Sequence, residues 1–96
     1  MTGFSREKQI ERVVCKYAEK LGWLQFKFAS PGQVGVPDRI FFRKGICILI
    51  EFKRSPKFRA SKMQEYILHK LDEQGFRGYV CGSVDVGIEI FDEYQG

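Results

Sequence analysis

The sequence predicts one α/β domain, and three observations lead to that prediction. A helical stripe occupies residues 10–21, a tight turn at Lys44-Gly45 joins two apolar runs, and a Ser61-x-x-Gln64 capping box begins a second helix. The 96 residues are enough for one small domain, and a hydrophobic content of 44% indicates a folded core. We therefore expect a single domain over residues 1–96.

Charge and cysteine content narrow the class of protein. The 16 Lys and Arg residues exceed the 12 Asp and Glu residues, and the net charge of +4 is weakly typical of a protein with a polyanionic partner. Cys15, Cys47 and Cys81 lack Cys-x-x-Cys spacing, which argues against zinc and a disulfide framework, and each is expected to be a small buried hydrophobe. No signal peptide or membrane-spanning run is visible, so we expect a cytoplasmic protein.

The first helix is predicted from a capping residue and an apolar stripe. Ser5 is the expected cap, and Gly22 is the expected end. Between them, apolar residues recur with helical spacing at Ile10, Val13, Val14, Tyr17, Ala18 and Leu21. Glu11 lies beside this stripe, and its position alone favours a solvated residue at the flank of the helix.

Three strands are expected to follow. Residues 23–28 alternate, with Leu24, Phe26 and Phe28 on one face, and residues 29–37 form a loop. Strands over 38–42 and 46–53 form a hairpin, and the second is apolar on both faces, as in a central strand. A two-residue turn pairs Arg43 with Ile46 and therefore places Asp38 opposite Glu51.

The next segment is basic and precedes the second helix. We favour contact with a phosphate backbone over a solvated loop for residues 54–61. The candidate DNA-binding residues are Arg54, Lys57 and Arg59 in this segment and Lys62 directly after it. The helix begins after Ser61 and ends at Gly75, and its expected buried face is Met63, Tyr66, Ile67 and Leu71. His69 is expected to be exposed or partly packed. A fourth strand covers residues 79–81, and residues 83–94 favour a short helix capped by Ser83 over a strand.

The predicted chemistry comes from two facing carboxylates and a lysine. Asp38 and Glu51 would repel each other without a cation between them, and oxygen-rich pairs of this kind suit Mg²⁺ or Mn²⁺. Lys53 lies on the same strand face as Glu51 and could stabilise charge on a phosphate or orient a water molecule. A structural hairpin with a salt bridge would explain Glu51 and Lys53, but it gives no reason for Asp38 to face Glu51.

These residues resemble the signature of the PD-(D/E)XK nuclease superfamily: Pro37-Asp38 on one strand and Glu51-Phe52-Lys53 on the next. With Gly35-Val36-Pro37-Asp38, a preceding helix that carries Glu11 and a following helix that begins near Gln64, the whole pattern resembles the VRR-NUC family. The resemblance runs from about residue 5 to 81. It implies an α/β fold with a restriction-endonuclease-like αβββαβ core, in which helices flank a mixed central sheet.

The resemblance also implies roles for individual residues. Asp38, Glu51 and the main-chain carbonyl of Phe52 would bind the metal, together with Glu11. Asp38, Glu51, Lys53 and Gln64 would be the catalytic residues. Glu11 and Gln64 thus gain a functional role beyond the structural one that their positions suggest.

The expected activity is that of a Mg²⁺- or Mn²⁺-dependent endodeoxyribonuclease in DNA repair. Stand-alone members of the family that the chain resembles cut branched DNA, including four-way (Holliday) junctions, and a bacterial or phage origin is expected. The alternatives are a restriction-like or nicking endonuclease on duplex DNA, or a non-catalytic DNA-binding module. Two cuts at a junction require two sites, so a homodimer is expected. Phe4, Phe58 and Phe91 are the candidate interface residues.

Overall fold

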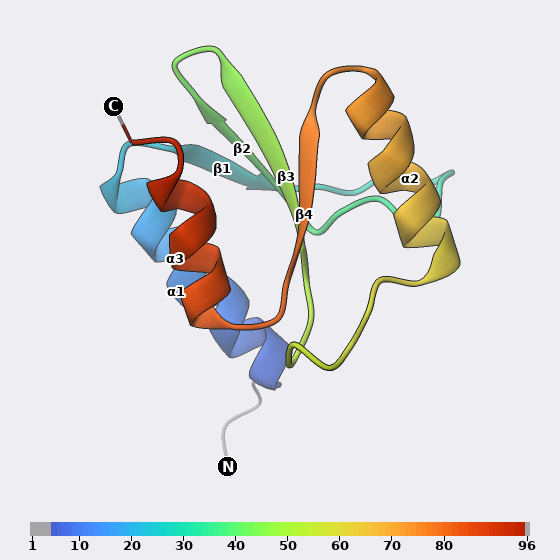
Figure 1. Cartoon of the computed structure of the whole chain (residues 1–96), viewed down its shortest axis with the longest axis horizontal. Coiled ribbons are helices and arrows are strands. Elements are labelled where there is room, and N and C mark those ends of the chain that lie inside the picture. The colour runs from blue at the N-terminus through green and yellow to red at the C-terminus, as the bar shows by residue number, and fades with distance from the viewer. Residues whose placement is uncertain (1–4, 96) are drawn as a thin grey trace.

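The computed structural model describes residues 5–95, which form three helices and four strands (Figure 1). In chain order, the elements are α1 (Arg6–Lys20), β1 (Leu24–Lys27), β2 (Arg39–Arg43), β3 (Ile46–Phe52), α2 (Lys62–Glu73), β4 (Arg77–Cys81) and α3 (Val84–Asp92). The predicted αβββαβ order is confirmed, and the C-terminal segment is the helix that Ser83 was expected to cap. No helix within residues 5–95 has the length and apolar character needed to cross a membrane.

The four strands form one mixed sheet in the order β1-β2-β3-β4. The first three strands are antiparallel, whereas β4 runs parallel to β3 after the α2 crossover. Lys44 and Gly45 have φ angles of 47° and 81°, as a two-residue hairpin turn requires. Arg43 pairs with Ile46, so the predicted register is confirmed. The central position of β3, which is buried from Ile48 onward, is also confirmed.

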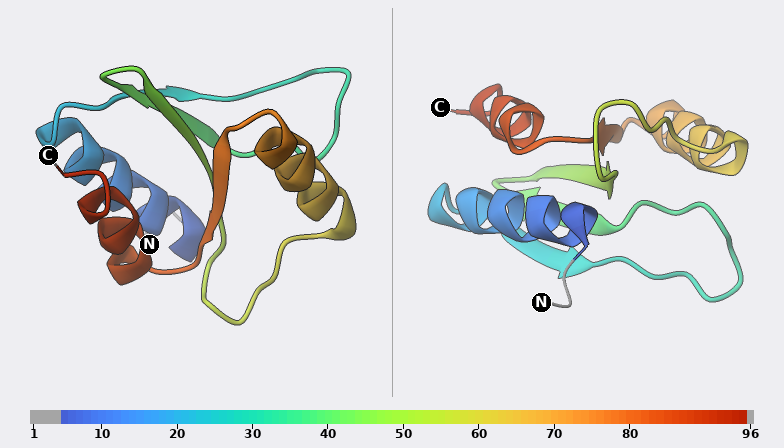
Figure 2. Two further views of the ribbon diagram at one scale, coloured as in Figure 1. Left: turned by 45° about the horizontal axis from the view of Figure 1, so that its top comes forward. Right: turned by 90° about the horizontal axis from the view of Figure 1, so that it is seen from below.

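The hydrophobic core lies between one face of the sheet and the helices α1 and α3. These two helices lie side by side (Figures 1 and 2), and their contact depends on the absence of a side chain at Gly87. A Cβ atom there would lie 2.3 Å from Cγ2 of Val14. The sheet contributes Phe41, Ile48 and Ile50, all of which are almost fully buried. The packing of α1 and α3 against this face of the sheet supports the ends of β2 and β3.

Helix α2 covers only part of the opposite face of the sheet. It packs against β4, where Leu68 occupies the space above Gly78. The predicted buried face of α2 was wrong in part, because Met63 and Tyr66 are 44% and 54% exposed and no residue of this helix is fully buried. The reason is tertiary: a helix over an edge strand buries a narrower stripe than one packed between two layers.

The open part of this face lies over β1 and β2. Leu24 and Phe26 alternate with polar residues as predicted, yet they are 63% and 55% exposed because none of the three helices within residues 5–95 covers them. Phe42 lies beside Phe26, with ring centroids 6.4 Å apart. The polar side of β1 faces α1 instead, where Gln25 hydrogen-bonds to Glu19.

Three further expectations were wrong. Val13 belongs to the helical stripe but is 42% exposed, because α3 covers α1 from one side only. Cys47 is half-buried on the open face, unlike the buried Cys15 and Cys81. Phe91 is fully buried against Phe41 and Trp23, so it is unavailable for an interface. Phe4 lies outside the described residues.

Candidate active site

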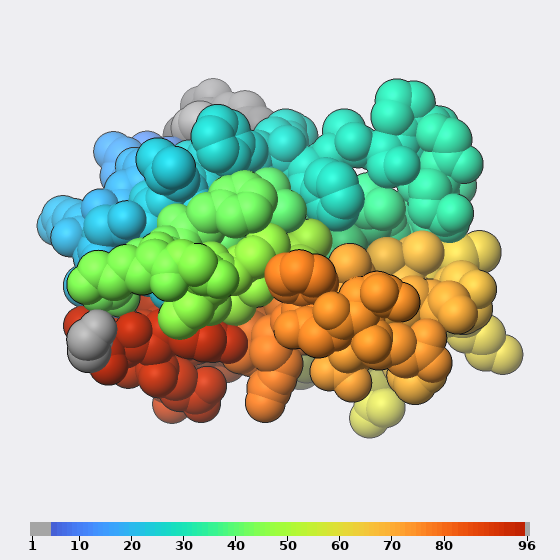
Figure 3. Space-filling view, turned by 90° about the horizontal axis from the view of Figure 1, so that it is seen from above, coloured from blue at the N-terminus to red at the C-terminus, as the bar shows by residue number. Residues whose placement is uncertain are grey.

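The loop over residues 29–37 leads to Asp38, which lies directly before the start of the inner strand β2. It crosses towards the first turn of α2, and Figure 3 shows the two segments against each other on one side of the molecule. Gly35 has a φ of +96°, and a Cβ atom there would lie 2.7 Å from Cγ of Met63. Glycine is therefore required both by the backbone conformation and by the close approach. Pro37 is fully buried and fixes the chain immediately before Asp38.

Asp38 is held against β3 by both its backbone and its side chain. Its N–H donates to the carbonyl of Ile50 at 3.0 Å, and its Oδ2 accepts from the N–H of Phe52 at 2.8 Å. These two bonds bracket Glu51. Burial raises the pKa of Asp38, and the nearby Glu11 carboxylate raises it further, against the opposing hydrogen bond from Phe52.

Glu51 is the most constrained acid of the site. It is 5% exposed, its Oε2 accepts from Nε2 of Gln64 at 2.7 Å, and Nζ of Lys53 lies 3.6 Å from the same oxygen. Burial, and then the charge of Asp38, raise the pKa of Glu51 to about 7. Its Oε1 is buried and has no hydrogen-bond partner within residues 5–95. Oε2 of Glu51 is thus held in place, whereas no described residue offsets the cost of burying Oε1.

Gln64 joins the start of α2 to this acid. Its Oε1 accepts from the N–H of Ser61 at 2.8 Å and from Nζ of Lys53 at 2.9 Å, while its Nε2 donates to Glu51. Ser61 Oγ in turn accepts from the N–H of Gln64 at 3.1 Å, which completes the predicted capping box. One side chain therefore caps the helix and orients both Lys53 and Glu51.

Glu11 lies close to these residues but is engaged elsewhere. It is 8% exposed, so the solvated position that its spacing alone favoured was wrong. Its Oε2 accepts from Nε of Arg39 at 2.5 Å, and Arg39 also donates to Oε1 of Gln25 at 2.9 Å. Within residues 5–95, no group of three or more acidic, His or Cys side chains is arranged to hold a metal ion. The negative charge of Glu11 still acts on Asp38, because it helps to raise the pKa of that residue.

The donor set around Glu51 nevertheless fits a divalent cation. Mg²⁺ and Mn²⁺ prefer carboxylate and carbonyl oxygens, and they tolerate sites with one or two carboxylates. Asp38 and the unpartnered Oε1 of Glu51 are of this kind, and so is the main-chain carbonyl of Phe52 between Glu51 and Lys53. A cation beside Oε1 would also relieve the repulsion between the two carboxylates.

The basic residues of the connection between β3 and α2, and the first residue of α2, are all exposed: Arg54, Lys57, Arg59 and Lys62. The guanidinium of Arg54 stacks over the ring of Phe58 at 4.1 Å, which restrains its direction. The connection is also held at its base, where a Cβ atom on Gly82 would lie 2.6 Å from the backbone of Ser55. The loop is thus anchored beside the end of β3.

Sequence reasoning missed Arg39, which binds Glu11 and connects α1 to both β1 and β2. The signal was available in principle, because Arg39 directly follows Asp38 and must point to the opposite face of the sheet. Its partner could not be named without the position of α1.

Comparisons with known proteins are consistent with this geometry. The structure superposes on a solved VRR_NUC domain with a TM-score of 0.89, covering 95% of this chain and 99% of the other at 21% identity. The fold is therefore that of a VRR_NUC domain. A scan against protein families finds no match.

One curated relative has a related sequence. It is "Putative nuclease p44" of Acyrthosiphon pisum secondary endosymbiont phage 1, and it is 41% identical over 49 residues. The matched segment covers 50% of this chain and 53% of the relative, so the chain spans about half the length of that protein. The structural comparison shows the fold, and the relative in sequence carries the name of a nuclease.

Proposed function

On the VRR-NUC assignment that the fold and the phage relative jointly support, we propose that this chain is a nuclease that hydrolyses DNA phosphodiester bonds with Mg²⁺ or Mn²⁺. The observation that carries the proposal is the environment of Glu51. A buried carboxylate oxygen without a partner, next to a second carboxylate and a lysine, is costly in a purely structural hairpin. A bound cation would offset the cost of burying this oxygen and would therefore explain the arrangement.

Asp38, Glu51 and the carbonyl of Phe52 would hold the metal ion, which would polarise the phosphate and lower the pKa of a water molecule. Lys53 is held by Gln64 at 2.9 Å and is 18% exposed, so its charge is available at the surface of the site. There it stabilises the negative charge that develops on the phosphate. Water attacks phosphorus, the bond to the 3′ oxygen breaks, and this oxygen leaves as a hydroxyl.

Glu11 fits a supporting role in this proposal. Its ion pair with Arg39 keeps a negative charge near Asp38 but holds the Glu11 carboxylate apart from the carboxylates of Asp38 and Glu51. The basic residues Arg54, Lys57, Arg59 and Lys62 would bind DNA phosphates beside the cleaved bond, because they are exposed and lie in the segment that follows Lys53.

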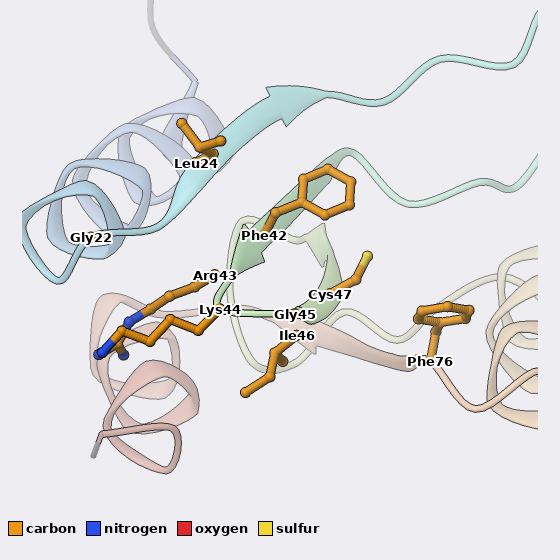
Figure 4. Close-up of a pocket in the computed structure, with 9 residues that line it drawn as sticks. All are labelled: Gly22, Leu24, Phe42, Arg43, Lys44, Gly45, Ile46, Cys47 and Phe76. Atoms are coloured by element: carbon orange, nitrogen blue, oxygen red, sulfur yellow. The ribbon is translucent and has the colours of Figure 1, made fainter.

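We propose branched DNA, in particular the four-way junction, as the substrate. The resemblance to stand-alone members of the family motivates this choice. A two-fold dimer would supply two sites for the two symmetric cuts. The exposed apolar face over β1 and β2 supports a second copy as its cover, and Figure 4 shows two of its residues, Leu24 and Phe42, among the side chains that line a pocket.

Cleavage of a four-way junction and of a matched linear duplex, each with Mg²⁺, Mn²⁺ or EDTA, tests the proposal. We expect cleavage with either metal, none with EDTA, and a preference for the junction. Glu51→Gln and Asp38→Asn should be inactive, whereas His69→Ala, at an exposed position of α2, should cut like wild type. Cleavage by Glu51→Gln at the wild-type rate would exclude this site as the catalytic centre.

A further inference from the structure

Helix α1 carries a row of cations that the site described above does not use. Lys8, Arg12 and Lys16 are exposed and four residues apart, so they lie on one face of the helix. They line a groove of about 330 Å³ together with Glu11, Cys15, Glu19, Gln25 and Arg39. Four residues correspond to about 6 Å along a helix, so the row extends over roughly 12 Å.

The acidic residues of this groove are engaged within the protein. Glu11 is paired with Arg39, and Oε2 of Glu19 accepts a hydrogen bond from Gln25. By contrast, neither Lys8 nor Lys16 forms a side-chain ion pair with any residue in the range 5–95. The four cations that line the groove, Lys8, Arg12, Lys16 and Arg39, outnumber its two carboxylates, Glu11 and Glu19, so the groove presents a net positive charge to solvent.

The groove comes near the acid pair at the end of the sheet where Asp38 lies. Arg39, which lines the groove, directly follows Asp38 in the chain and points to the other face of the sheet, and Glu11, also a lining residue, pairs with Arg39. The basic loop lies at another border, where Arg54 and Lys57 share a concavity with Arg6 at the start of α1. Positive surfaces thus flank the acid pair on two sides.

We infer that the α1 groove binds a second stretch of the DNA backbone, so that the substrate lies across the active site between α1 and the basic loop. This inference rests on the proposed nuclease function. A span of about 12 Å corresponds to three or four base pairs at about 3.4 Å per phosphate of one strand. Among residues 5–95, no aromatic side chain lines the groove, so the contact is to phosphates and is independent of sequence.

The test measures binding of a fluorescent four-way junction in EDTA as a function of salt. In the double variant Lys8→Gln with Lys16→Gln, two phosphate contacts should be lost. The slope of log Kd against log salt should fall by about 1.8, and the Kd should rise at least about tenfold near 0.1 M salt. The matched control is Lys44→Gln with Lys70→Gln, which removes the same charge at the hairpin turn and on α2.

A salt slope for the α1 variant equal to that of the control would overturn the inference, whether or not the wild type cuts the junction. A larger reduction of the slope in the α1 variant than in the control would support it. The proposed function fails separately, if wild type binds the junction but does not cut it with Mg²⁺ or Mn²⁺. Circular dichroism of both variants ensures that the comparison is between folded proteins.

Discussion

At the scale of single residues, Glu51 should make stability depend on pH and on metal. Its pKa is raised from 4.5 to about 7 in the folded protein, so between these values the folded state holds a proton that the unfolded state has lost. Stability therefore falls as pH rises through this window, by at most about 1.4 kcal/mol per pH unit from this group. Thermal unfolding in EDTA should show a falling melting temperature from pH 5 to pH 7.

Glu51→Gln is the control for this measurement, since the amide cannot titrate. Its melting temperature should vary less over the same range, and Mn²⁺ at pH 7.5 should stabilise wild type but not the variant. Identical pH profiles for the two proteins would show that Glu51 is not the titrating group.

Lys53 and Gln64 should differ in their effects on catalysis. Lys53→Ala removes the charge proposed to act on the phosphate and should lower cleavage by about 10²–10³-fold or more, while stabilisation by Mn²⁺ persists. Gln64→Ala should weaken activity less, because it leaves Lys53 in place with one restraint fewer. Full activity in Lys53→Ala would refute the proposed mechanism.

At the scale of elements, the two serine caps provide a matched pair. Ser61 Oγ and Ser83 Oγ each accept from a backbone N–H at 3.1 Å, in α2 and α3 respectively. Each serine-to-alanine change should cost about 1 kcal/mol in urea unfolding. Only Ser61→Ala should also lower cleavage, because the same cap holds Gln64 against Glu51 and Lys53. Equal activity in both variants would mean that the cap does not position the site.

At the scale of the whole molecule, the open face over β1 and β2 should decide the oligomeric state. Sedimentation at micromolar concentration should give a dimer for wild type and a monomer for Phe26→Lys, which places a charge on the exposed apolar side. Val34→Lys, at a loop residue that is 78% exposed, is the control and should remain dimeric. The monomeric variant should nick junctions without paired cuts. Wild type that sediments as a monomer with and without junction DNA would exclude the dimer.

Local chemistry determined much of this protein. The capping residues Ser5, Ser61 and Ser83 and the Lys44-Gly45 turn act over a few residues, so the sequence located the helix starts and the hairpin register correctly. The register also placed Asp38 next to Glu51, because strand pairing propagates from the turn.

Tertiary structure decided what each element covers and what each polar group meets. The apolar sides of β1 and of the first turn of α2 are exposed, because only three short helices are present within residues 5–95 to cover a four-stranded sheet. The spacing within the helix predicts that Glu11 lies at the flank of the apolar stripe, in solvent. In the structure it is buried against Arg39, which belongs to a strand and lies 28 positions further along the chain. The spacing of apolar residues and the intrinsic propensities of the amino acids predict which helix or strand a residue belongs to. The burial and the pKa of a side chain depend instead on the elements that pack against it.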